Sequence, residues 1–200
     1  MVGNIPGYVK TDIIRAFLLM KENISRNELV KKLELGEGTV RTILDILKHK
    51  NLICSTKQGH SLTEKGNLFL KKTEKSMVVK RLILEDFYPE LEKAVVLLKK
   101  PYKNIKISFE QRDIAVKQGA DGAVILKFDN KLYIPDADIN FKESYKKAYN
   151  EILKCFDFKK SDILIICFAD CLRNAENGAL AIALTMSKEL NDLIRTSMTC

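Results

Sequence analysis

The sequence has no tryptophan and only four prolines and two histidines among its 200 residues. The longest uninterrupted apolar run, Ile163 to Ala169, is far shorter than the about 20 apolar residues that a membrane-spanning helix needs. We therefore expect no transmembrane segment. The start, Met-Val-Gly-Asn-Ile-Pro, has no basic stretch followed by an apolar core. We accordingly expect a cytoplasmic protein without a secretion signal.

Cysteines are few and scattered, which argues against the even, regularly spaced set of a disulfide framework. Both histidines precede residue 61, far from most of the sulfurs, so a Cys/His zinc site is not expected. We predict no metal and no cofactor. The simplest interpretation is that the cysteines are buried free thiols and have no metal or redox role: Cys54, Cys155, Cys167, Cys171 and Cys200.

Positive charge is concentrated in the first third of the chain. Residues 1–76 contain 14 Lys and Arg against 8 Asp and Glu, whereas the remainder contains 20 against 18. Six of the eight net positive charges therefore belong to the N-terminal part. A concentrated positive field favours polyanionic partners such as nucleic acids. The alternative is a Lys-rich surface that only keeps the protein soluble, which would give the same charge distribution.

Three amphipathic helices are predicted in the first 50 residues. Thr11 can cap a helix that ends near Asn23, and Ser25 and Glu28 form a capping-box pattern ahead of a second helix. A Gly-containing turn then leads to a third helix over about 37–50. Its apolar face consists of Val40, Ile43, Leu44 and Leu47.

A small hairpin and a fourth helix follow the third helix. Residues 52–56 and 61–62 can pair around a turn of Lys57-Gln58-Gly59-His60. The next helix opens at Thr63 and runs toward Lys75. Helix, helix, turn, helix and a two-stranded wing is the order of elements in which the third helix enters the DNA major groove.

The residues Gly36 to Leu44, Leu52-Ile53 and Leu62 to Gly66 resemble the winged helix-turn-helix of prokaryotic transcription regulators. The resemblance implies that the N-terminal half of the third helix reads bases and that the wing tip contacts DNA. Among the implied base readers Arg41 is the strongest candidate, because a guanidinium can pair bidentately with guanine. The candidate DNA contacts are Thr39, Arg41, Thr42 and Lys48 on the helix and Lys57, Gln58 and His60 in the wing.

Two acidic residues lie on or near this predicted DNA-binding face. Glu37 and Asp45 would repel phosphate unless they accept from cytosine or pair with Arg41 and Lys48. A winged helix that binds protein instead of DNA is therefore a second interpretation.

The remaining sequence predicts a small α/β domain. Strands are expected over 78–84, 94–98, 123–128, 131–134 and 162–168, and helices over 110–118, 142–156 and 175–195. Asp129-Asn130 is a two-residue hairpin signal. The predicted fold class is α+β, with an N-terminal winged helix-turn-helix domain over 1–76 and a small two-layer or three-layer α/β sandwich domain over 77–200.

No phosphate loop, dinucleotide fingerprint or nucleophile elbow occurs in this second domain, so we assign no catalytic residue and expect no enzyme. Polar residues do follow a buried strand, at the place where open α/β sheets bind ligands and a helix N-terminus attracts anions. The alternative is ordinary capping, with Asn174 as the N-cap. The candidate ligand-binding residues are Arg112, Asp121, Asp170, Arg173 and Asn174.

The segments Arg112 to Ala115, Gln118 to Ala123 and Asp162 to Asp170 resemble those of archaeal regulators in which a winged helix precedes an α/β domain of uncharacterised function. That resemblance implies a sensor or dimerisation domain. The leading hypothesis is a homodimeric transcriptional regulator that binds double-stranded DNA and senses a small anionic metabolite. The alternatives are an enzyme acting on a small phosphorylated metabolite with a regulatory winged helix, and a winged-helix protein-interaction scaffold.

Overall fold

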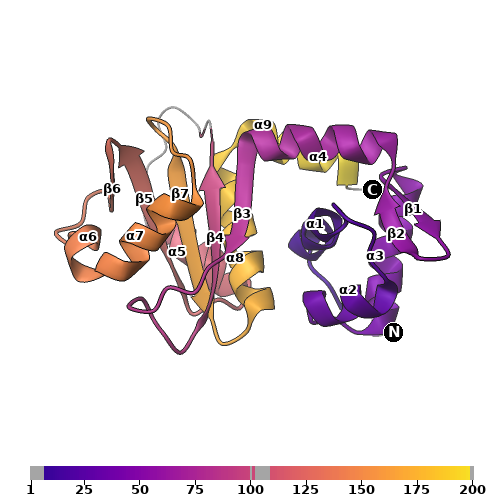
Figure 1. Ribbon diagram of the computed structural model, residues 1–200, viewed down its shortest axis with the longest axis horizontal. Helices are drawn as coiled ribbons and strands as arrows, with labels where there is room; N and C mark the ends of the chain where they lie inside the picture. The colour runs from indigo at the N-terminus through magenta and orange to yellow at the C-terminus, as the bar shows by residue number, and fades with distance from the viewer. Residues whose placement is uncertain (1–6, 100, 102–108, 199–200) are drawn as a thin grey trace. The chain divides into compact units, whose positions relative to one another are not determined.

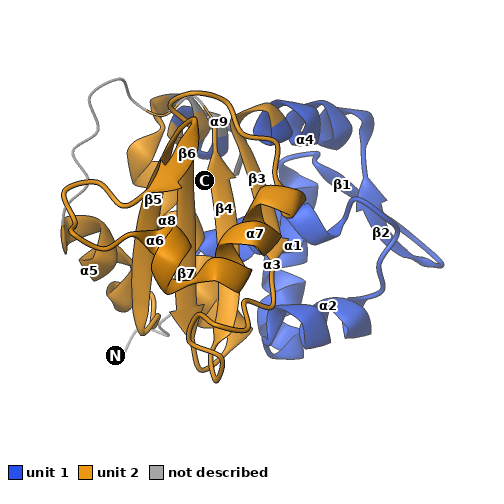
Figure 2. Cartoon of the chain, turned by 60° about the vertical axis from the view of Figure 1, so that its left-hand side comes forward, with its two compact units in different colours: residues 1–74, 192–200 blue, residues 75–191 orange. Residues whose placement is uncertain are grey.

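The computed structural model describes residues 7–99, 101 and 109–198. The chain divides into two units, Met1–Glu74 with Asp192–Cys200 (unit 1) and Lys75–Asn191 (unit 2) (Figures 1 and 2). The division after residue 74 lies two residues before the expected one at 76. Residues 192–200, which we had placed in the second domain, group with unit 1.

Unit 1 begins with the three expected helices, α1 (Lys10–Leu19), α2 (Arg26–Leu33) and α3 (Glu37–His49). The capping box of α2 is confirmed, since the Ser25 hydroxyl accepts from the Glu28 N–H and the Glu28 carboxylate accepts from the Ser25 N–H. Thr11 is not the cap of α1. It lies buried within the helix, and Asp12 accepts the Val9 N–H at 3.0 Å in its place.

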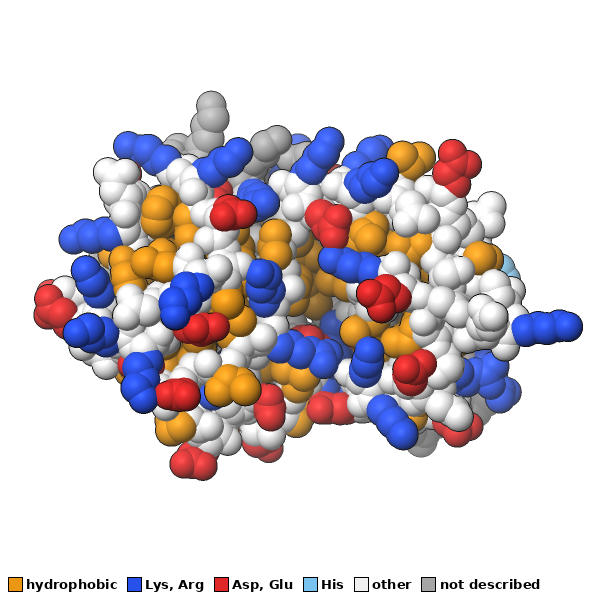
Figure 3. Space-filling view, in the orientation of Figure 1, with side chains coloured by type: hydrophobic (Ala, Val, Ile, Leu, Met, Phe, Trp, Pro, Cys, Tyr) orange, Lys and Arg blue, Asp and Glu red, His pale blue; other side chains and the backbone are white. Residues whose placement is uncertain are grey.

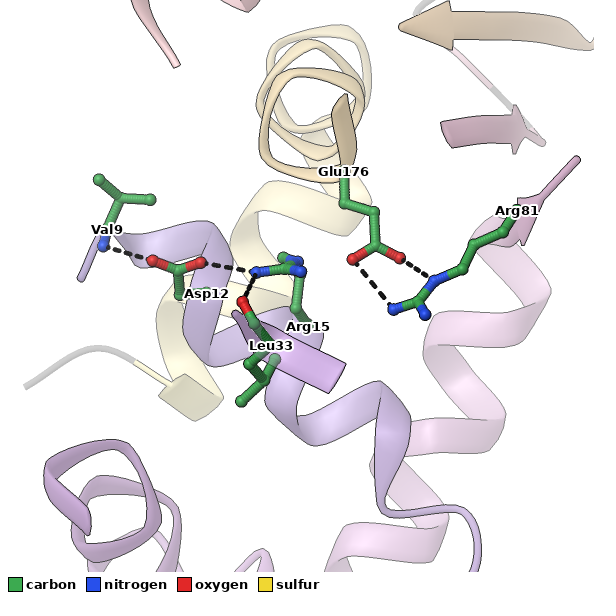
Figure 4. A network of polar contacts seen from close by, with 6 residues as sticks. All are labelled: Val9, Asp12, Arg15, Leu33, Arg81 and Glu176. Atoms are coloured by element: carbon green, nitrogen blue, oxygen red, sulfur yellow. Dashed lines mark hydrogen bonds and ion pairs between the residues drawn. The ribbon is translucent and has the colours of Figure 1, made fainter. Parts of the chain in front are cut away.

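A buried ion pair within α1 also contacts the end of α2. Arg15 of α1 donates to Asp12 at 3.0 Å and to the backbone carbonyl of Leu33, the last residue of α2, at 3.0 Å (Figure 4). Asp12 and Arg15 are 0% and 3% exposed. The bond from Arg15 to Leu33 therefore ties α1 to the last residue of α2. The expected apolar face of α3 is buried as well.

The wing is a two-stranded antiparallel sheet of β1 (Ile53–Thr56) and β2 (Gly59–Leu62). Only Lys57 and Gln58 form its turn, so the predicted four-residue turn was too long. His60 also exchanges two backbone hydrogen bonds with Ile24, which adds a third short strand segment. Gly59 has φ +142, and a Cβ there would lie 2.5 Å from the Ile24 carbonyl oxygen, so glycine is needed for this approach.

The fourth helix, α4 (Glu64–Ser76), is confirmed. Thr63 caps it, because its hydroxyl accepts from the Gly66 N–H at 3.0 Å and donates to the Asn51 carbonyl at 2.6 Å. The same side chain therefore links the start of α4 to the end of α3. These elements together make unit 1 a winged helix-turn-helix.

Unit 2 contains one five-stranded sheet in the order β3-β4-β7-β5-β6, and every neighbouring pair is antiparallel. The predicted hairpin between β5 and β6 is confirmed, but its turn is shorter than the two residues Asp129-Asn130, because Asp129 pairs with Lys131 and Asn130, at φ 61, lies between them. The strands are β3 (Met77–Arg81), β4 (Glu92–Leu98), β5 (Gly122–Asp129), β6 (Lys131–Tyr133) and β7 (Ile163–Ala169).

Helices cover both faces of this sheet, which makes unit 2 a three-layer α/β sandwich. Helices α6 (Phe141–Ser144) and α7 (Lys146–Cys155) cover one face, and α5 (Phe109–Lys117) and α8 (Leu172–Met186) cover the other (Figures 1 and 2). Side chains of β7 alternate between the two faces, and all seven are buried. Two covered faces explain why β7 is an unbroken apolar run.

Two expected helices are interrupted. The helix predicted over 142–156 breaks at Tyr145, whose ring packs against Phe87 and Phe141, and both Asp86 carboxylate oxygens accept N–H groups at the start of α7. The long final helix predicted over 175–195 breaks at the extended residue Ser187, which caps α9 (Lys188–Met198). Helix α8 starts at Leu172 with Cys171 as its N-cap, so Asn174 is not the cap.

The cysteines in the described residues are free, but only Cys167 is buried. Cys54 is exposed, and Cys155 and Cys171 are half-buried, so the prediction of buried thiols was wrong for these three. Burial raises the pKa of the Cys167 thiol. Cys200 lies outside the described residues. No helix in the described ranges has a stretch long and apolar enough to cross a membrane.

Candidate functional site

The outward face of α3 is the first candidate site. Positions 41, 45 and 49 lie about one turn apart, with position 42 beside them, on the side opposite the buried Val40 and Leu47. Arg41 and Thr42 are exposed, whereas Thr39 and Lys48 flank the face and are half-buried. The Thr42 hydroxyl donates to the Gly38 carbonyl at 3.1 Å, so its oxygen can still accept a hydrogen bond.

The basic side chains of this face are not neutralised by neighbours. Within the described residues, none of Arg41, Lys48 and Lys57 takes part in an ion pair. Glu37 and Asp45 are exposed and do not pair with them. The three cations therefore remain available to an anion outside the protein. In the space-filling view, basic side chains project from the β1–β2 end of unit 1 with acidic ones interspersed (Figure 3).

The wing brings Lys57 and Gln58 to its exposed turn, as predicted, but not His60. His60 is 7% exposed, and its Nδ1 lies 2.9 Å from the Ser55 hydroxyl. A side chain buried in the strand cannot reach a phosphate at the wing tip, so the predicted contact by His60 is wrong for a physical reason. The hairpin turn is shorter than the sequence indicated.

Burial lowers the pKa of His60, and the positive charges of Lys48 and then Arg26 lower it further. Each of these two cations therefore lies close enough to His60 in the wing to act on its charge. Arg26 is exposed at the first position of α2, where the helix dipole is positive. Sequence reasoning missed Arg26, although its place directly after the Ser25 cap could have pointed to it. It also missed the exposed His49, which follows Thr42 by two turns.

Unit 2 contains the second candidate site, a cavity of about 850 Å³ beside residues 122–125 of strand β5. Tyr88 and Phe168 form one wall, with stacked rings whose centroids lie 4.1 Å apart at an interplanar angle of 14°. Phe109 and Ile139 stand at the rim and are 81% and 57% exposed. The lining is mostly apolar, and its charged side chains among the described residues are Arg112, Asp121 and Asp136.

Gly122 shapes the floor of this pocket. A Cβ at this position would lie 2.6 Å from Cζ of Phe168, so only glycine leaves room for the ring. Strand β6 pairs with only Lys127–Asp129 of β5, and in the described residues its ladder does not extend over Gly122–Ile125. Alternate peptide groups of that stretch therefore point away from β7, toward the pocket.

The structure brings together two of the five predicted ligand residues, Arg112 and Asp121. Asp170 donates its N–H to Asp121 at 3.1 Å but does not line the pocket. Arg173 and Asn174 lie in the first turn of α8. The Asn174 side chain packs so closely against Gly119 that a Cβ added to this glycine would lie 2.9 Å from it.

The reason for this difference is the antiparallel sheet. The rule that places ligands at carboxyl strand ends holds for parallel sheets, whereas neighbouring carboxyl ends here lie at opposite edges. The pocket residues Tyr88, Phe109, Asp136 and Phe168 were missed because they come from separate loops and elements. In the part of the chain that is described, no three His, Cys, Asp or Glu side chains gather in a way that could hold a metal ion.

Two family models match the sequence, the PH0730-like N-terminal domain over residues 10–68 and a domain of unknown function, DUF4443, over residues 91–186. The solved structure of the hypothetical protein PH0730 from Pyrococcus horikoshii OT3 is 30% identical, with a TM-score of 0.81 over 95% of this chain and 99% of that chain. An IclR transcriptional regulator from Alicyclobacillus acidocaldarius is 11% identical, with a TM-score of 0.29 over 92% and 98% of the two chains. No curated protein matches.

Proposed function

The chain belongs to the PH0730-like family, and from that premise we propose that it is a DNA-binding transcriptional regulator. The observation that carries this proposal is the outward face of α3, where exposed Arg41 and Thr42 lie beside cations without ion-pair partners in the described residues. Such a helix can enter the major groove while the wing turn reaches the backbone.

Roles are assigned by position on this surface. Arg41, with Thr42 and Thr39 beside it, reads bases, whereas Lys48, Arg26 and the wing residues Lys57 and Gln58 contact phosphate. The net charge of residues 1–76 supplies the long-range attraction, because neutralised phosphates release counterions. Asp45 faces the groove from the same helix and fits acceptance from a cytosine amino group.

The chain acts as a homodimer in this proposal, and unit 2 pairs the subunits and senses a small ligand. A two-fold dimer would read two half-sites about 34–36 Å apart, one turn of DNA. Ligand occupancy would shift the population of dimers whose recognition helices match that spacing. We assign unit 2 no catalytic role. Turnover of a phosphorylated metabolite by the full chain would contradict that assignment.

Selection of bound sequences from random duplex DNA tests the proposal. We expect a palindromic consensus, whose symmetry would report the dimer. Arg41→Ala should relax selection at one base position and cost about 1–3 kcal/mol of specific binding free energy. Lys57→Ala should weaken binding to all sequences and reduce the salt slope by about 1.

A matched control is Lys71→Ala, which removes the same charge from an exposed position on α4. It should leave the selected sequence unchanged. No binding to any duplex at low salt would contradict the proposal and favour a winged helix that binds protein. An unchanged consensus with Arg41→Ala would remove Arg41 from base readout.

A further inference from the structure

The pocket of unit 2 combines an apolar body with charges of both signs. Its aromatic wall, the stacked Tyr88 and Phe168, presents a flat face, and Phe109 and Ile139 leave large apolar side chains at the rim. Exposed apolar side chains that gather around one concavity are typical of a ligand site. Its volume of about 850 Å³ lies within the range of small-molecule pockets, about 300–1,000 Å³.

The charges select among ligands of that size. Among the described residues, two carboxylates, Asp121 and Asp136, and one guanidinium, Arg112, line the cavity. A purely anionic ligand such as a phosphate ester would meet Arg112 but would be repelled by both carboxylates. A purely cationic ligand would meet the carboxylates but would be repelled by Arg112. Only a ligand that carries both charges complements all three groups.

The backbone adds a second, independent feature. Gly122–Ile125 of β5 line the pocket, and β6 does not pair with them. Peptide N–H and C=O groups along that edge can bond to the carboxylate, ammonium or amide groups of a ligand. Such groups belong to amino acids and peptides.

We propose that this pocket binds an amino-acid-like zwitterion with a large apolar side chain, either the free amino acid or a short peptide. Arg112 takes the carboxylate, Asp121 and Asp136 take the ammonium group, and the Tyr88–Phe168 wall covers the side chain. The inference rests on the proposed sensing role of unit 2 and gives that role a ligand class.

The absence of tryptophan from the chain makes a direct test simple. Indole fluorescence can be excited at wavelengths where tyrosine does not absorb, so an indole ligand is observed without protein background. The full-length protein is titrated against L-tryptophan, tryptamine, indole-3-propionate and indole. In that order, the probes carry both charges, the ammonium group only, the carboxylate only, and no charge.

We expect saturable binding of L-tryptophan, about threefold tighter than that of either singly charged probe, because each charge is paired at a solvent-exposed position. Arg112→Gln should abolish the advantage over tryptamine. The double variant Asp121→Asn, Asp136→Asn should abolish the advantage over indole-3-propionate. Lys117→Gln, which removes an exposed cation of the same helix outside the pocket, is the control and should change nothing.

Gly122→Val provides a variant that does not depend on charge. The added side chain would push Phe168 into the cavity and should abolish binding of all four probes. Circular dichroism shows whether each variant is folded. If Gly122→Val does not fold, the charge variants still decide whether the proposal holds. A dipeptide, L-tryptophyl-L-leucine, identifies the size of the ligand: tighter binding than L-tryptophan indicates a peptide, and weaker binding the free amino acid.

Three outcomes would overturn the proposal. In the first, none of the probes binds saturably to the wild-type protein. In the second, indole binds as tightly as L-tryptophan. In the third, Arg112→Gln leaves the preference for L-tryptophan over tryptamine intact. DNA selection with the same protein does not involve the pocket, so failure there would count against the regulator and not against this ligand class.

Discussion

Replacement of Arg15 by methionine should strongly destabilise unit 1. The side chain is 3% exposed, and the change removes its bonds of 3.0 Å to Asp12 and 3.0 Å to the Leu33 carbonyl (Figure 4). It leaves the Asp12 carboxylate, 0% exposed, without the guanidinium. Loss of one member of a buried pair costs about 3–5 kcal/mol, a large part of the about 5–15 kcal/mol that stabilises a typical domain.

Urea unfolding followed by far-ultraviolet circular dichroism measures this cost, since the chain offers no tryptophan fluorescence. The double variant Asp12→Asn, Arg15→Met leaves no charge buried and keeps an oxygen for the Val9 N–H. It should therefore be more stable than Arg15→Met alone. Lys21→Met is the control, because the Lys21–Glu74 pair is exposed and such pairs contribute at most about 1 kcal/mol.

The interpretation of the buried pair would be refuted by either of two results. In the first, Arg15→Met lowers the unfolding midpoint no more than Lys21→Met does. In the second, the double variant is as unstable as the single one. Both would mean that the carboxylate of Asp12 does not need its cation and that other contacts hold α2 against α1.

Two further perturbations test other parts of the structure. Asp86→Ala removes the acceptor of two N–H groups at the start of α7 and should cost about 1–2 kcal/mol in urea unfolding; Asp86→Asn should recover part of this, and a loss too small to measure would show that the cap does not matter. The pKa of His60 is lowered by burial and then by Lys48 and Arg26, so the unfolded chain takes up this proton first. The folded state therefore keeps its full stability while His60 is neutral, above the unfolded pKa of about 6.5, and loses part of it as the pH falls below that value and the unfolded chain binds the proton. His60→Gln should lack this component when unfolding free energies are measured between neutral and mildly acidic pH, and equal slopes in both proteins would contradict the assignment.

Local signals explain why unit 1 could be read from the sequence. Apolar residues at helical spacing place Val40 and Leu47 in the core whatever packs against them, and the Ser25–Glu28 capping box is closed within four consecutive residues. The exposed positions of α3, Arg41 and Thr42 among them, follow from the same periodicity. Prediction failed at His60 because a long-range contact with Ile24 places it in the sheet. It failed at Thr11 for a local reason, because α1 starts earlier than expected and Asp12 bonds to the Val9 N–H at its start.

Unit 2 depended more on contacts between distant residues. The helix break at Tyr145 follows from packing on Phe87 and from the Asp86 cap, about 60 residues away in sequence, and no propensity encodes it. The strands were found from their apolar runs, but their antiparallel order was not, and that order decided where a ligand could bind.

By itself, the sequence therefore determined the helices and wing strands of residues 10–76, the apolar strands of unit 2 and the charge that distinguishes the two parts, because each of these depends on spacing along the chain. Only the tertiary structure decided which polar residues meet. It joined Arg112 and Asp121 to Asp136 and the Tyr88–Phe168 wall, and it left Asp170, Arg173 and Asn174 outside the pocket. The physical reason is that a binding site is a set of distances between remote residues, and those distances are fixed by strand order and helix packing.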